Sequence, residues 1–296
     1  MNFIKKLTDE KQQEITLSKY LQEHLEGYSK ARSVDHIHAS DLTKDDPQFC
    51  PREIALLRMT GKKRKDQYLN QSLKVAFTIG EAYHDMIRNV WLRDIAIGHW
   101  KCPHCSAKVE FSKLPKIKCP ECGSNKWEYD EVRFNSTELD VSGAIDLMVD
   151  LQLQKTVIVE IKSMDKDQFS DLIAPLAEHR IRTSLYLKII ESSDVVWKDR
   201  IDLTHARIIY VSKGYGKKNE QGKFTPFKEY VIQRNDDAIQ PYLNKAIMMK
   251  KFTDNNIVPC GVCKSSFDPR MKACTVAPEC FGQMYPAGGV FKKSLT

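Results

Sequence analysis

The chain has 296 residues and a net charge of +7, with 42% hydrophobic and 29% charged residues. These values are ordinary for a soluble globular protein of one or two domains, and the charge permits nucleic-acid binding without requiring it. No apolar run approaches the ~18 residues of a membrane span. The opening MNFIKKLTDEKQQE lacks the apolar centre of a signal peptide. We therefore expect a cytoplasmic protein without membrane contact.

Two helices are predicted in the first sixty residues. Residues 8–29 place Ile15, Leu21 and Leu25 near one helical face, and a second helix begins at Pro51, since proline is favoured in the first helical turn. The basic segment GKKRKD follows. It either contacts nucleic-acid phosphates or is a solvated turn, and its candidate contacts are Lys62, Lys63 and Arg64.

A longer helix is predicted over residues 72–96. On it His84 shares a face with Gly80, Ile87 and Trp91, so the histidine should point inward. An inward histidine is most often a core residue, and spacing alone assigns it no function.

Nine cysteines are many for a reducing compartment, where grouped cysteines indicate metal binding rather than disulfides. One quartet has the spacing C-x2-C-x13-C-x2-C. Its two knuckles supply four thiolates for tetrahedral zinc and leave no coordination position open, which predicts a structural zinc ribbon. The ligands are Cys102, Cys105, Cys119 and Cys122.

Two predicted strands after the ribbon, within the stretch GAIDLMVDLQLQKTVIVEIKS, carry charges among apolar residues. Alternation along a strand puts Glu160 and Lys162 on one face, and the short DLQLQK linker allows a hairpin that brings Asp146 near Glu160. Burying these charges costs several kcal/mol unless a partner such as a divalent cation compensates. The alternative is a polar surface strand with an ordinary ion pair.

The remaining pattern predicts a helix over 167–193, a buried strand over 205–213 and an amphipathic helix over 236–252. This order favours an α/β or α+β fold. A second basic loop, SKGYGKKNEQGK, offers Lys217 and Lys218 as phosphate contacts or as solvated charges.

The cysteines of the C-terminal tail admit two interpretations. Cys260, Cys263, Cys274 and Cys280 form a second zinc site, with Cys50 a free buried thiol. Alternatively, Cys50 joins three of them around an iron–sulfur cluster, which would staple an early helix to the tail. Local spacing by itself favours zinc.

Four motifs together resemble the PD-(D/E)XK nucleases, in particular the RecB-like group that includes CRISPR-associated and exonuclease V-type iron–sulfur exonucleases. They are GEAYH, GAID, VEIKS thirteen residues further on, and a helical H-x6-Y. The resemblance covers residues 38–282, interrupted by the ribbon, and implies a mixed sheet flanked by helices with an inserted zinc ribbon. The matching residues are His84, Asp146, Glu160, Lys162, His179 and Tyr186.

The resemblance implies a site for Mg²⁺ or Mn²⁺. Its ligands would be Asp146, Glu160, the carbonyl of Ile161 and His84, while Lys162 would position the attacking water. Tyr186 would be a further catalytic residue. Where the family has Gln-x-x-x-Tyr, this chain has Arg182, which would bind a DNA phosphate or hold a carboxylate.

Members of this group that bind a 4Fe–4S cluster use one early and three late cysteines. The late cysteines of these members have the spacing C-x2-C-x5-C. Here the spacing is C-x2-C-x10-C-x5-C, so the tail has one cysteine more than the cluster needs. The implied ligands are Cys50, Cys260, Cys263 and Cys280, with Cys274 as a competitor.

The implied function is a metal-dependent exonuclease acting on single-stranded or end-frayed DNA in recombination, repair or viral DNA processing, with a helicase or recombination partner. The alternatives are a catalytically weak DNA-binding module and a restriction-type endonuclease. The implied division is an N-terminal helical region of the nuclease (1–98), the ribbon (99–130), the nuclease core (131–258) and a cysteine-rich segment closing onto Cys50 (259–296).

Overall fold

The computed structural model describes residues 17, 21, 25, 27–29, 31, 33–44, 49–214, 218, 222–272 and 274–281. Its largest sheet has the strand order β12-β11-β10-β9. β10 and β11 are parallel and the other two pairings antiparallel, so the sheet is mixed. The strands are β9 (Leu147–Val149), β10 (Val157–Met164), β11 (His205–Ser212) and β12 (Phe227–Gln233).

The described residues also form three smaller sheets, with the strand orders β2-β8-β7, β5-β4-β6 and β1-β3. The first contains β2 (Ile37–His38), β7 (Val132–Ser136) and β8 (Val141–Ile145). The second spans the predicted ribbon, with β4 (Ile97–Lys101), β5 (Lys108–Lys113) and β6 (Glu128–Asp130). The third pairs β1 (Gly27–Ser29) with β3 (Gln67–Leu69).

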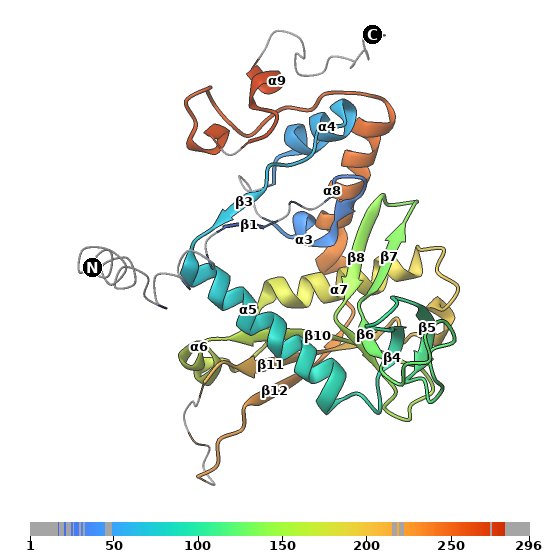
Figure 1. Cartoon of the computed structure of the whole chain (residues 1–296). Coiled ribbons are helices and arrows are strands. Elements are labelled where there is room, and N and C mark those ends of the chain that lie inside the picture. The colour runs from blue at the N-terminus through green and yellow to red at the C-terminus, as the bar shows by residue number, and fades with distance from the viewer. Residues whose placement is uncertain are drawn as a thin grey trace, which may run out of the picture.

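Helices flank the sheets, as Figure 1 shows for α5 and α7 beside β10–β12. α7 contacts β11, β12, β7 and β8, and α5 contacts β10. None of the described helices has the length and apolar composition to cross a membrane. The helices are α3 (Ala39–Leu42), α4 (Pro51–Thr60), α5 (Gln71–Met86), α6 (Lys166–Asp171), α7 (Ala177–Glu191), α8 (Asp236–Asp254) and α9 (Ala277–Phe281), with a π-helical segment η1 (Ile87–Trp91) directly after α5 and two 3-10 turns, η2 (Lys198–Arg200) and η3 (Pro269–Lys272).

Several predicted helices begin as expected but end differently. α4 has Pro51 in its first turn. Most of the predicted helix 8–29 lies outside the described residues, and its last three residues form β1 instead. The predicted helix 72–96 ends at Trp91, and Trp91 is 45% exposed, so it does not share an inward face with His84.

Proline divides the predicted helix 167–193 into α6 and α7. Pro175 lacks a backbone N–H and disfavours helical geometry in the residue before it, so the chain from Leu172 to Leu176 leaves the helix. The predicted strand 143–149 is also divided, at Asp146, where the chain passes from β8 in one sheet to β9 in another.

Both faces of β10 are covered, since all residues from Val157 to Ile161 are buried. Glu160 is only 4% exposed. The interpretation of β10 as a polar surface strand is therefore wrong, and the charges along it require partners inside the protein.

The ribbon packs against the core through its strands and one aromatic pair. Ala96, just before β4, bridges to Val149 at the end of β9. In β5, the ring of Phe111 stacks on Trp197 with centroids 5.3 Å apart. The three-stranded unit is thereby joined to the central sheet (Figure 1).

Candidate active site and cysteine sites

Asp146 and Glu160 are brought together by antiparallel pairing of β9 with β10, which confirms the predicted hairpin. The paired register ends at Leu147 and Val159, so Asp146 and Glu160 are the next residues along the two strands. The backbone N–H of Ile161 donates a 2.9 Å hydrogen bond to Asp146 Oδ2. This bond holds the Asp146 carboxylate against β10.

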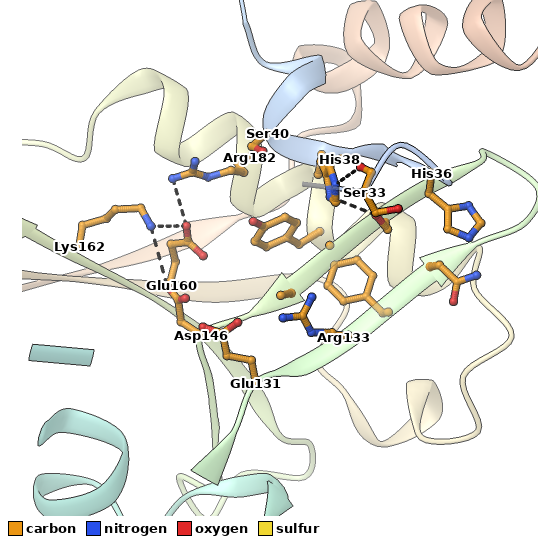
Figure 2. A pocket seen from close by; sticks show the side chains of 17 residues that line it. Ser33, His36, His38, Ser40, Glu131, Arg133, Asp146, Glu160, Lys162 and Arg182 are labelled. Atoms are coloured by element: carbon orange, nitrogen blue, oxygen red, sulfur yellow. Dashed lines mark hydrogen bonds and ion pairs between the residues drawn. The ribbon is translucent and has the colours of Figure 1, made fainter. Parts of the chain in front are cut away.

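Two cationic side chains converge on Glu160, one from β10 and one from α7 (Figure 2). Lys162 Nζ lies 2.5 Å from Glu160 Oε1 and 3.8 Å from Asp146 Oδ2. Arg182 Nη2 lies 3.1 Å from the same Glu160 oxygen. Burial opposes the charge of Arg182, but Glu160 and further groups that include Tyr186 together outweigh this effect and raise the pKa of Arg182.

Arg88 and Glu131 complete the charged cluster, and neither was singled out from the sequence. Arg88 Nη2 lies 3.2 Å from Asp146 Oδ1, 3.0 Å from Glu131 Oε1 and 3.1 Å from His84 Nδ1. His84 Nδ1 is itself 3.5 Å from Asp146 Oδ1. Arg88 follows His84 by four residues, a helical spacing that could have identified it. Glu131, just before β7, has no comparable local signal.

The carboxyl of Asp146 is held ionised by this cluster. Burial alone would raise its pKa, but its contact with His84 and the positive charges of Lys162 and Arg88 lower it well below its usual range. An ionised, half-buried carboxylate is a suitable hard oxygen ligand for a divalent cation.

Two cavities of about 650 Å³ each adjoin at these acids. The first runs past Glu160, Arg182 and Tyr186, and the second past His84 and Arg88. The side chains that line both cavities are Glu131, Asp146 and Lys162. The charged cluster is thus reached from two directions, and Figure 2 shows it from the first cavity.

Tyr186 and His179, four and three residues from Arg182 on α7, lie in different surroundings. Tyr186 is buried, packs edge-to-face on Phe134 with centroids 5.5 Å apart and lines the first cavity. His179 Nδ1 is 2.8 Å from the hydroxyl of Tyr210, and His179 lines neither cavity.

The basic residues after α4 contact the tail and α3 rather than the cavities. Lys62 forms an ion pair with Glu279, and Arg64 Nη1 is 3.4 Å from Asp41 Oδ2. Lys63 is exposed. In the second basic loop Lys218 is exposed, and Lys217 lies outside the described residues.

The four ribbon cysteines form a ready metal site. Within the described ranges they are the one group of three or more histidine, cysteine or carboxylate ligand atoms that lie within 4.8 Å of one another. Each knuckle closes in the same way: the N–H groups of Ser106 and Gly123 donate to the carbonyls of Cys102 and Cys119. Both closing residues have positive φ, 65° and 73°. A metal such as zinc fits this thiolate set.

Among the ribbon thiols, ionisation of Cys102 is favoured by the local backbone. Burial would raise the pKa of Cys102, but hydrogen bonds from the amides of Cys105 and His104 lower it to about 6. A thiolate is the form that binds metal, so the backbone of the knuckle prepares its own ligand.

The tail lies beside α4, which follows directly from Cys50 (Figure 1). Arg52, buried in the first turn of α4, donates to the carbonyls of Pro259 and Cys280 at 3.1 and 3.0 Å. A contact that spans more than 200 residues of sequence therefore closes the tail onto this helix.

Four of the five remaining cysteines influence one another. Burial, followed by Asp268, raises the pKa of Cys263, and burial, followed by Glu53, raises that of Cys274 to about 11. The thiols of Cys50 and Cys280 contribute to both shifts. Cys260 is exposed. Among the described residues these thiols do not form a group as tight as the ribbon quartet, whose spacing suits a single tetrahedral ion.

Comparison with family models and with curated proteins finds no match. Among solved structures, SSO0001 is 16% identical with a TM-score of 0.36, covering 92% of this chain and 95% of that one. An alkaline exonuclease (LHK-Exo) from Laribacter hongkongensis is 12% identical with a TM-score of 0.39, covering 75% of this chain and 89% of that one. The same protein in complex with dAMP is 13% identical, with a TM-score of 0.38. Structural similarity at such low TM-scores gives no evidence about the function of this chain.

Proposed function

We propose that this chain is a divalent-metal-dependent nuclease that hydrolyses phosphodiester bonds from the ends of single-stranded or end-frayed DNA. One observation carries the proposal: Asp146, Glu160 and Lys162 stand together where two cavities of about 650 Å³ adjoin. Two carboxylates and a lysine that can be reached from two sides suit a DNA strand that passes through the site.

The donor set fits Mg²⁺ or Mn²⁺. Asp146, Glu160, the carbonyl of Ile161 and His84 would hold the ion, which when bound polarises the scissile phosphate. Lys162 Nζ lies 2.5 Å from Glu160 and 3.8 Å from Asp146. It would orient the attacking water and offset the charge that develops on phosphorus-bound oxygens.

Side chains on α7 that line the first cavity would contact the DNA strand. Arg182 would donate to a phosphate oxygen, and Tyr186, beside it in the cavity lining, would assist as a further catalytic group. Away from the cavities, the exposed Lys63 and Lys218 would add phosphate contacts, as would Lys217 beside Lys218 in the sequence. Lys62 and Arg64 would do so only on leaving Glu279 and Asp41.

Two metal centres would serve the structure rather than the chemistry. The ribbon (99–130) would hold Zn²⁺ between the N-terminal helical region (1–98) and the nuclease core (131–258). The segment 259–296 would close onto α4 through a 4Fe–4S cluster, with ligands Cys50, Cys260, Cys263 and Cys280 and with Cys274 in competition. A helicase or recombination partner would supply the single strand.

A second candidate is a DNA-binding module without turnover. It is favoured by the double pairing of Glu160 Oε1, which lies 2.5 Å from Lys162 and 3.1 Å from Arg182. A carboxylate already neutralised in this way is a poor metal ligand until a cation moves.

The test is degradation of end-labelled single-stranded DNA by anaerobically purified protein with Mg²⁺, with Mn²⁺ and with chelator. We expect metal-dependent shortening that falls by about 100-fold or more in Asp146→Asn, which keeps an acceptor for Ile161 N–H but loses the charge. Asp150→Asn, four residues away and paired with Lys113, is the matched control and should cut normally. Wild-type protein that binds DNA without cutting it would favour the second candidate.

A further inference from the structure

Arg88 holds two of the atoms that the proposed function assigns to the metal. Its Nη2 lies 3.2 Å from Asp146 Oδ1 and 3.1 Å from His84 Nδ1. Because a guanidinium only donates hydrogen bonds, His84 Nδ1 accepts this one with the lone pair that would bind a cation. Arg88 is 8% exposed, so solvent does little to weaken the pairing.

Lys162 and Arg182 hold the other two ligand atoms. Lys162 Nζ lies 2.5 Å from Glu160 Oε1 and 3.1 Å from the carbonyl oxygen of Ile161. Arg182 Nη2 adds a second contact to the Glu160 oxygen at 3.1 Å. Each of the four residues proposed to bind the metal is therefore contacted, at one ligand atom or more, by a cation of the protein itself.

Among the side chains at the proposed ligands, formal charges cancel without any ion. Three cations (Arg88, Lys162 and Arg182) face three carboxylates (Glu131, Asp146 and Glu160). A fourth carboxylate, Glu178, lies 3.9 Å from Arg182 but is exposed, so solvent screens its charge. A divalent cation would add two uncompensated positive charges to a half-buried site, which is unfavourable. Phosphodiester groups carry one negative charge each, so a nucleic-acid strand in the cavities would restore the balance.

We propose that the divalent cation and the phosphodiester strand bind with positive coupling, since Arg88 and Arg182 release the ligand atoms by turning to backbone phosphates. Arg182 lines the first cavity and Arg88 the second, so each has space for a phosphate beside it. The inference rests on the proposed nuclease function, and it assigns both arginines a positioning role. Coupling is reciprocal, so the cation tightens strand binding by the same factor.

The test is a titration of wild-type protein with Mn²⁺, in which electron paramagnetic resonance counts free ions. It is done alone, with a single-stranded phosphorothioate oligonucleotide that resists cleavage, and with a methylphosphonate oligonucleotide that has the same bases but an uncharged backbone. We expect the phosphorothioate strand to tighten Mn²⁺ binding at the site by about 10-fold or more, and the methylphosphonate strand to have little effect.

Charge-removing variants test the two arginines separately. Arg88→Met and Arg182→Gln should each bind Mn²⁺ about 10-fold more tightly than wild type without any strand, and should show weaker coupling. Arg88→Lys keeps the charge and should retain the coupling. Arg93→Met is the matched control, because Arg93 bonds to the carbonyl of Trp127 rather than to a carboxylate. If Arg88→Met fails to fold, Arg182→Gln decides the question.

Equal Mn²⁺ affinity with and without the charged strand would overturn the coupling while leaving the nuclease proposal intact. Coupled binding without hydrolysis of unmodified DNA would overturn the nuclease proposal and leave the coupling. Protein that binds no Mn²⁺ in any arm would overturn both.

Discussion

At the scale of single residues, His179 shows how the cationic cluster acts beyond the atoms it touches. Its Nδ1 lies 2.8 Å from Tyr210 Oη, in a partly buried position on α7. Burial, then the positive charges of Lys162 and Arg182, lowers the pKa of His179 from 6.5 to about 3. His179 is therefore a neutral hydrogen-bonding group at ordinary pH.

We predict that the imidazole of His179 does not titrate between pH 8 and about pH 4.5 in the folded protein. The unfolded chain protonates it near 6.5, so its contribution to the free energy of unfolding is present above that pH and is lost as the pH falls toward 3. NMR of histidine-labelled protein measures the titration, with His179→Gln assigning the resonance. A titration midpoint near 6.5 would contradict the prediction.

At the scale of secondary structure, the glycine of GAID is required by the packing of β7 on β8. Gly143 lies opposite Phe134 in the strand register. A Cβ at Gly143 would come within 2.5 Å of Phe134 Cζ. Phe134 is buried and packs on Tyr186, so it has little room to move.

Gly143→Ala should therefore lower the free energy of unfolding by about 1–3 kcal/mol, because Phe134 would be forced off its rotamer. Urea denaturation monitored by circular dichroism measures the change. Adding Phe134→Leu should restore some of the lost stability. Gly27→Ala is the control, since a Cβ there meets nothing within 4 Å and should change stability little. A neutral Gly143→Ala would contradict the steric explanation.

At the scale of the whole molecule, the buried Arg52 joins α4 to the cysteine-rich tail. Its guanidinium donates to the carbonyls of Pro259 and Cys280. Gly261 lies over the same side chain, where an added Cβ would be 3.1 Å from Arg52 Cδ. A second link, between Arg270 and Glu53, is 3.4 Å long and partly exposed.

Arg52→Gln should lower the free energy of unfolding by about 2 kcal/mol, because two carbonyls lose a charged donor in a buried place. Hydrogen exchange measured by mass spectrometry should accelerate in residues 258–272 and not in α7. Arg270→Gln is the comparison and should cost less than about 1 kcal/mol, since its ion pair is partly exposed. Equal protection of the tail in wild type and Arg52→Gln would show that other contacts close it.

Features set by neighbours in the chain could be predicted. The ribbon knuckles follow from C-x2-C spacing, and the meeting of Asp146 with Glu160 follows from a short hairpin linker. Helix starts were also accessible, as at Pro51. Helix ends were harder to predict. The prediction of one continuous helix over 167–193 did not take account of Pro175, although the proline was visible in the sequence.

Partners far apart in the sequence were decided only by tertiary structure. The sequence of β10 by itself showed that charged residues lie within an apolar strand. It did not show which side chains would contact those charges. The segment η1 that follows α5, the helix α7 and the residue before β7 supplied Arg88, Arg182 and Glu131. The physical reason is that an ion pair depends on distance in space, whereas spacing along the chain determines that distance only within one helix, one knuckle or one hairpin.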